Sequence, residues 1–148
     1  MGIEKLGRDY TGMDLRRVDL RELYLAGANM TGADLKGADL RGMDLSDTCF
    51  TDANLTGAQL QGANLKYAIF DNTKMNGANL YKADMRGAKV IKSSLAGASL
   101  RYAKMQEARL SETVVLYADF TGANVEHLNL NSNTTDGAIG LPDDFDDY

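Results

Sequence analysis

Few side chains of this chain belong to the types that catalyse reactions or bind metals. It has one histidine, His127, and one cysteine, Cys49, so no cluster of these residues has the spacing of zinc ligands. Glycines recur every five residues, as in Gly27, Gly32 and Gly37, but no lysine with a following serine or threonine comes after them as in a phosphate-binding loop. We therefore expect no catalytic site, no metal and no cofactor.

The composition indicates a folded protein with a narrow interior. Of the 148 residues, 44% are hydrophobic and 25% are charged, which is a globular balance. There is no tryptophan and only one proline, whereas 15 residues are glycine. Cys49 cannot form an intrachain disulfide, and no stretch has the pattern of a signal peptide or a membrane span. We therefore expect a soluble, cytoplasmic protein with no membrane association.

The strongest pattern is a column of large apolar residues at every fifth position. It comprises 25 consecutive positions without a change of phase. Its members are Tyr10, Leu15, Leu20, Leu25, Met30, Leu35, Leu40, Leu45, Phe50, Leu55, Leu60, Leu65, Phe70, Met75, Leu80, Met85, Val90, Leu95, Leu100, Met105, Leu110, Val115, Phe120, Val125 and Leu130. An α-helix cannot explain this column, because five residues advance about 500° around a helix and would carry it across every face.

Smaller residues form a second column, two positions before the first. Alanine occupies 15 of its 25 positions, and a polar residue such as Asp34 or Asn54 lies between the two columns. Residues two apart in an extended chain point the same way, so both columns face inward and the polar residue faces solvent. The next inward pair begins three residues later, so the chain must turn once in every repeat. Glycine often lies at this turn, for example Gly37 and Gly57, because it adopts left-handed conformations readily.

These repeats resemble the pentapeptide repeat family, whose motif is Ala, then Asp or Asn, then Leu, then two freer positions. Direct matches are Ala33-Asp34-Leu35-Lys36-Gly37 and Ala38-Asp39-Leu40-Arg41-Gly42. The resemblance implies an all-β fold, a right-handed quadrilateral parallel β-helix (a solenoid) with about six coils of four pentapeptide repeats each. The stacking of Thr11, Thr31 and Thr51 at intervals of 20 residues agrees with four repeats per coil.

The repeats divide the chain into three expected parts. Residues 1–7 form an N-terminal lead-in, residues 8–132 form the β-helix, and residues 133–148 form an acidic cap or tail. Pro142 suits the first turn of a short helix, which would fold Leu141 and Phe145 over the last coil, and a frayed tail is the alternative. Bulky residues replace alanine in the first coil and are expected to fill the N-terminal end of the interior: Met13, Val18 and Leu23.

Charge is distributed unevenly along the chain. The net charge is −5, yet residues 8–132 hold 15 acids and 15 bases. Residues 46–110 hold nine bases and five acids, whereas residues 111–148 hold eight acids and no base. Some members of the resembled family bind DNA gyrase by imitating duplex DNA, which carries one charge per about 1.7 Å of axis. A rod that is acidic only at one end fits this role poorly. A nucleic-acid partner is also disfavoured, because scattered basic residues usually form only a solvent-exposed face of a protein.

An apolar and aromatic patch is the candidate binding site. Val114, Leu116 and Tyr117 occupy outward positions of one repeat, and Tyr81 and Tyr102 are expected outside on the next face. Exposed side chains of these types can mark a contact surface. The alternative is a locally distorted corner that buries Leu116 or Val114. We therefore predict a non-enzymatic protein-binding or scaffold module with flat β-helix faces, whose protein partner the sequence does not identify. Two alternatives stay open: a gyrase- or topoisomerase-binding DNA mimic of the quinolone-protection type, and a self-associating rod or homodimer joined through the C-terminal end.

Overall fold

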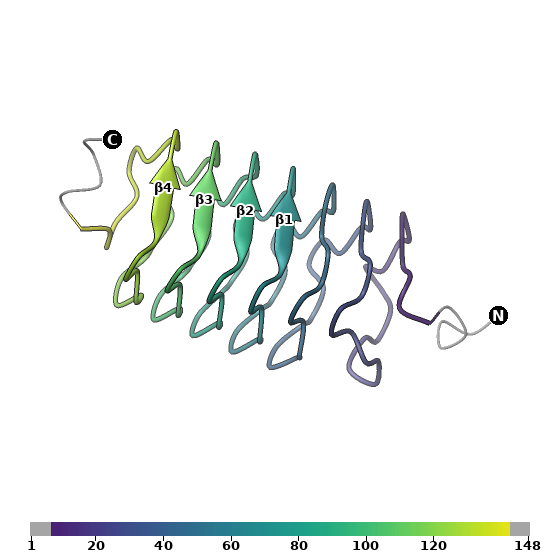
Figure 1. Cartoon of the computed structure of the whole chain (residues 1–148). Coiled ribbons are helices and arrows are strands. Elements are labelled where there is room, and N and C mark those ends of the chain that lie inside the picture. Colours follow the sequence, from purple (N-terminus) through teal and green to yellow (C-terminus); the bar gives the residue numbers. More distant parts are fainter. Residues whose placement is uncertain (1–6, 143–148) are drawn as a thin grey trace.

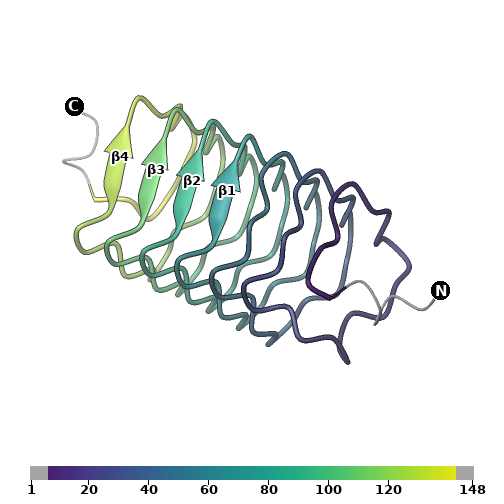
Figure 2. The ribbon, with the colours of Figure 1, turned by 45° about the vertical axis from the view of Figure 1, so that its right-hand side comes forward.

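The chain forms a rod of stacked four-sided coils. The computed structural model describes residues 7–142. Each side of a coil is one five-residue repeat, and successive coils stack along the rod from the N-terminal to the C-terminal end (Figures 1 and 2). We name the four faces by their first inward residue, as the Tyr10, Leu15, Leu20 and Leu25 faces.

Parallel backbone pairing joins each coil to the next. The four strands lie on the Tyr10 face in the C-terminal half of the rod: β1 (Ile69–Asp71), β2 (Lys89–Ile91), β3 (Arg109–Ser111) and β4 (Asn129–Asn131). They form one sheet in chain order, and each residue pairs with the residue 20 positions later, as Phe70 does with Val90. Isolated bridges repeat this offset on the other faces, for example between Asp14 and Asp34. The constant offset confirms the predicted parallel β-helix with four repeats per coil.

The column of large apolar residues fills the interior, as predicted. Every member from Tyr10 to Phe120 is buried, and alanines of the second column pack beside them. The rings of Phe50 and Phe70 stack one coil apart, with centroids 5.1 Å apart and planes inclined by 7°. The bulky residues of the first coil, Met13, Val18 and Leu23, are half-buried against this core. Each coil packs only on its neighbours, so burial is least complete at the two ends.

Left-handed residues form nearly every corner. The residue two positions after each large inward residue has a positive φ whether it is a glycine, as Gly62 (φ 66°), or not, as Lys82 (φ 55°). The N–H of the next residue then closes the turn, as when Ala63 donates to the Leu60 carbonyl at 3.0 Å. These are the features of a type II turn, which explains why glycine recurs there. Among the described corners, the two that depart from this rule lie in the less regular first coil, at Arg17 and Glu22.

Buried hydroxyl side chains replace alanine at one corner of the C-terminal half. Thr73, Ser93 and Thr113 follow one another at intervals of 20 residues and are buried. The Thr73 N–H donates to Ser93 Oγ at 2.9 Å, and the Thr113 N–H donates to Asn133 Oδ1 at 2.8 Å. The Thr73 hydroxyl donates to the Phe50 carbonyl at 2.7 Å. Side chains thus satisfy amides that close the turn at other corners, so the backbone stays extended to the ends of β1, β2 and β3 before the left-handed residue.

The repeat architecture continues beyond residue 132, where the sequence places its end. Val115 donates its N–H to the Thr134 carbonyl at 2.9 Å, and Ile139 still pairs with Asp119. Leu141 then packs half-buried against the core cluster. The helix expected after Pro142, with Phe145, falls on residues 143–148, which lie outside the described residues.

Candidate interaction surface

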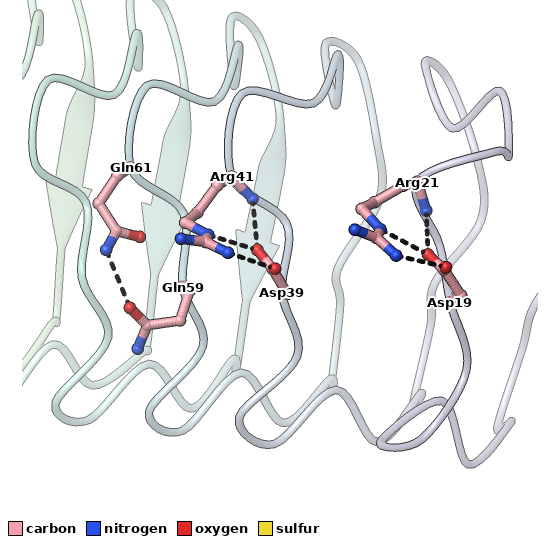
Figure 3. A network of polar contacts seen from close by, with 6 residues as sticks. All are labelled: Asp19, Arg21, Asp39, Arg41, Gln59 and Gln61. Atoms are coloured by element: carbon pink, nitrogen blue, oxygen red, sulfur yellow. Dashed lines mark hydrogen bonds and ion pairs between the residues drawn. The ribbon is translucent and has the colours of Figure 1, made fainter.

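Outward carboxylates are tied to their own repeats on the Leu20 face. Oδ1 of Asp39 accepts the Arg41 N–H at 3.3 Å, and the Arg41 guanidinium donates to both Asp39 oxygens at 2.8 and 2.7 Å. Asp19 and Arg21 repeat this arrangement one coil earlier, and Gln59 follows one coil later (Figure 3). Because the carboxylate caps a backbone N–H two residues on, Asp and Asn suit this position of the repeat. The N-terminal half of the Leu20 face therefore carries charges that neutralise one another.

These contacts also set the protonation of the aspartates. The Arg16 side chain hydrogen-bonds to Asp14 and lowers the pKa of that carboxyl from 3.8 to about 2, helped by the Arg16 backbone N–H. The Arg41 side chain has the same effect on Asp39, whose pKa also falls to about 2. Such pairs are exposed, so water screens them and they contribute little to stability individually.

The middle of the rod carries a belt of excess positive charge. Residues 72–106 hold seven bases and one acid, Asp84. Asp84 is already paired with Arg86 at 2.6 Å and with Lys66 at 3.7 Å. Within the described part of the chain, neither Lys82 nor Lys104 forms an ion pair. This belt, which we call the basic belt, therefore retains charge that the chain does not neutralise locally.

The structure brings Tyr81 and Tyr102 of the predicted patch together. Their rings meet edge to face, with centroids 5.8 Å apart and planes inclined by 87°. Tyr81 is 36% exposed and Tyr102 is 49% exposed. Lys82 Nζ lies 5.2 Å from the centre of the Tyr81 ring, and the Arg101 guanidinium carbon lies 6.0 Å from that of Tyr102. Aromatic rings and cations thus form one cluster, the tyrosine corner cluster, where the Leu20 and Leu25 faces meet.

The other predicted patch residues lie across the Leu20 face from this cluster. Tyr117 is 74% exposed at the corner between the Leu15 and Leu20 faces. Val114 and Leu116 precede it on the Leu15 face and are half-buried, so they present less apolar surface than expected. Within the described residues, no ring contact joins Tyr117 to Tyr81 or Tyr102. The patch is therefore two groups on opposite edges of one face.

Three corner tyrosines are held by glycines of the next coil, a feature that the analysis of the sequence missed. Gly122 lies under the Tyr102 ring, where an added Cβ would be 2.5 Å from Cε1. Tyr67 covers Gly87, and Tyr117 covers Gly137, in the same way. Each tyrosine precedes its glycine by 20 residues, the length of one coil. A comparison of residues 20 positions apart in the sequence would therefore have found all three pairs. The packing fixes large aromatic rings at the corners and leaves their outer surfaces accessible.

Further features of the described surface are an open depression and an exposed histidine. No group of three or more His, Cys, Asp or Glu side chains could hold a metal ion in this part of the chain. A depression of about 230 Å³ is lined by Lys66, Tyr67, Arg86, Gly87, Gln106 and Glu107 and is open to solvent. His127 is exposed, with Nε2 3.6 Å from a Glu126 carboxylate oxygen. No helix among the described residues is long and apolar enough to cross a bilayer.

Solved structures with the same architecture include two cyanobacterial proteins. Rfr23, a pentapeptide repeat protein of Cyanothece 51142, is 22% identical, with a TM-score of 0.57 over 91% of this chain and 92% of its own. The protein alr5209 of Nostoc PCC 7120 is 27% identical, with a TM-score of 0.56 over 69% of this chain and 84% of its own. QnrB1, a plasmid-mediated fluoroquinolone resistance protein, is 18% identical, with a TM-score of 0.42 over 91% of this chain and 83% of its own. The structures of Rfr23 and alr5209 support the fold and assign no role to this chain, and the TM-score of QnrB1 is too low to add to that support.

A family model agrees with the repeats and the coil geometry. No curated protein matches the chain significantly. The family model described as pentapeptide repeats (8 copies), in contrast, matches four stretches of the chain, residues 14–52, 53–90, 86–115 and 93–132. Together with the 20-residue register and the buried column, this match shows that the chain belongs to the pentapeptide repeat family.

Proposed function

We propose that the chain is a non-enzymatic protein-binding or scaffold module that presents the C-terminal half of its Leu20 face to a protein partner. The observation that carries this proposal is the anchoring of exposed tyrosines. Tyr102 and Tyr117 project from opposite edges of that face, and each ring is fixed by a glycine of the next coil. Preordered aromatic side chains lose little conformational freedom on binding, which is why tyrosine is enriched among the residues that dominate interfaces.

The shape of the rod supports binding over catalysis. Among the described residues, the apolar columns fill the interior, and buried hydroxyls such as that of Thr73 donate to backbone carbonyls, so we place no reactive site in a water-excluding cavity there. Its faces are stacked repeats with a fixed register, which provides a rigid surface for a second protein. A fold by itself does not define a function, so the proposal depends on the tyrosines and not on the β-helix.

The test compares two double variants of equal size. In the first, Tyr102→Asn and Tyr117→Asn remove the proposed contacts, since asparagine tolerates a left-handed backbone. In the control, Tyr24→Asn and Tyr67→Asn remove two exposed tyrosines that lie away from the Leu20 face. A partner captured from host extract is purified, and its affinity for each chain is measured. We expect the first variant to weaken binding about tenfold or more and the control to bind as wild type. Equal affinities of the partner for the two variants would show that the Leu20 face is not the binding surface. A failure to find any protein that binds saturably would contradict the proposed binding function.

Gyrase binding is the alternative that the charge distribution opposes. A mimic of DNA needs an extended acidic surface, whereas the basic belt interrupts this rod in the middle. Supercoiling by gyrase in the presence of micromolar chain is the direct measurement. We expect no protection from a quinolone and no inhibition, and either effect would favour the alternative.

Association through the C-terminal end is a second candidate function, favoured by incomplete burial there. Val125 and Leu130 are half-buried although they belong to the inward column, and Ile139 is 55% exposed. An end coil with unpaired backbone groups can accept another strand. Sedimentation velocity at several concentrations tests this candidate. A dimer that is lost in Ile139→Asp would support it, and a monomer at all concentrations would end it.

A further inference from the structure

We infer that the tyrosine corner cluster docks the acidic aromatic segment 143–148 of the same chain. The cluster consists of Tyr81, Lys82, Arg101 and Tyr102, and Lys104 lies two residues beyond it on the Leu25 face. The inference goes beyond the proposed function, because it assigns an occupant to one edge of the Leu20 face and needs no partner protein.

Charge and chemistry make the two surfaces complementary. Segment 143–148 contains four aspartates and two aromatic residues, with the sequence DDFDDY. The cluster offers cations beside aromatic rings, with Lys82 over Tyr81 and Arg101 over Tyr102. Carboxylates attract the cations, and the aromatic residues of the segment can pack edge to face against exposed tyrosine rings.

Other bases of the rod are poorer sites for this segment. Near the N-terminal end, Arg16, Arg21 and Arg41 already form ion pairs of 2.6 to 2.7 Å with aspartates of their own repeats. On the Tyr10 face, Lys89 and Arg109 are exposed, but within the described residues neither forms a cation–π contact with an aromatic ring. The tyrosine corner cluster combines aromatic surface with Lys82, which forms no ion pair among the described residues. Its second cation, Arg101, also pairs with Asp119 at 3.3 Å, a longer contact than those of the N-terminal arginines.

The last described residues lie on the face that leads to the cluster. Ile139 pairs with Asp119 on the Leu20 face, and the same ladder continues through Ser99 to Asn79. Tyr81 and Tyr102 follow Asn79 and Ser99 by two and three residues, so they lie two to three coils from Ile139. That separation is about 10 to 14 Å at the usual spacing of strands. Six extended residues reach about 20 Å, which is enough for the aspartates to meet Lys82 and Arg101.

Zero-length crosslinking of the full chain tests the inference directly. A carbodiimide joins lysine amines to carboxylates that are in contact, and mass spectrometry of the monomer fraction identifies the joined peptides. We expect the segment to be linked to Lys82 and Lys104 in several-fold excess over Lys74, Lys89 and Lys92, which are exposed on other faces. Equal linkage to all five lysines, or no linkage, would overturn the inference. Linkage confined to a dimer fraction would also overturn it, in favour of a second copy as the donor of the segment.

Two matched variants test the docking without changing the lysines whose crosslinks are measured. Arg101→Gln removes one cation of the cluster but leaves Lys82 and Lys104 in place. Arg109→Gln makes the same change of charge on the Tyr10 face. We expect Arg101→Gln to lower the yield of links to Lys82 several-fold and Arg109→Gln to leave it unchanged. An equal yield in the two variants would contradict docking at the cluster.

Discussion

The ring of Tyr102 lies directly on Gly122 of the next coil. An added Cβ on Gly122 would be 2.5 Å from Cε1 of that ring, which is closer than real contacts allow. The same offset of 20 residues places Tyr67 on Gly87. Corner glycines therefore serve two purposes in this rod: all of them permit the left-handed turn, and some also make room for an aromatic side chain.

Gly122→Ala is expected to destabilise the rod more than Gly62→Ala. Both glycines occupy the same corner with similar φ values, 71° and 66°, so each substitution adds about 1 to 2 kcal/mol of backbone strain. Only the Cβ at position 122 meets a ring, because nothing lies within 4 Å of one at position 62. Urea unfolding of both variants measures the difference. Equal losses would show that the Tyr102 ring moves away without cost.

Ser93→Ala is expected to cost about 1 to 3 kcal/mol in the free energy of unfolding, because it leaves the buried Thr73 N–H without its acceptor. The Ser93 hydroxyl also donates to the Phe70 carbonyl at 3.0 Å, and this bond is lost too. Ser99→Ala is the control, since Ser99 is only half-buried and outward-facing. Chemical denaturation of the two variants gives the comparison, and a loss as small as that of the control would mean that another group takes over the Thr73 amide.

Acid is expected to destabilise the fold between about pH 4 and pH 2. The pKa of Asp14 and that of Asp39 are about 2 in the folded chain, against 3.8 ordinarily, because arginine side chains hydrogen-bond to them. A depressed pKa in the folded state contributes stability above the unfolded value of about 3.9, and this contribution is lost as the pH falls through the folded value. Thermal unfolding at a series of pH values measures the decline. In Arg41→Gln we expect the pKa of Asp39, followed by NMR, to return toward 3.8, and an unchanged value would refute the assigned cause.

Leu60→Ala is expected to cost about 2 to 5 kcal/mol, whereas Leu130→Ala should cost clearly less. The chemical change is the same at both positions, but Leu60 is fully buried in the middle of the rod and Leu130 is half-buried in its last coil. Because each coil is supported by its neighbours alone, a cavity in the middle disrupts packing on both sides. Equilibrium unfolding of the two variants tests this, and equal losses would indicate that the last coil is as well supported as the centre.

The sequence alone determined the fold, because the period of five is expressed in every repeat. The unbroken series from Tyr10 to Leu130 required an inward column, and the glycines marked the turns. The spacing of five does not reveal how many sides each coil has. The number four was predicted from the family resemblance and from the 20-residue intervals between Thr11, Thr31 and Thr51. The burial of the inward column and the 20-residue register of the parallel strands confirm the predicted fold.

Only the tertiary structure decided which outward residues meet. Tyr81 and Tyr102 are 21 positions apart and touch, because one coil brings them onto adjacent turns of the same corner. Tyr102 and Tyr117 are closer in the sequence, yet they lie on opposite edges of a face, because three repeats carry the chain three corners around the rod. Inward residues follow one rule at every repeat, so a pattern identifies them. Contacts on the surface depend on side-chain reach across coils and on partners such as Gly122, and those relations exist only once the coils are stacked.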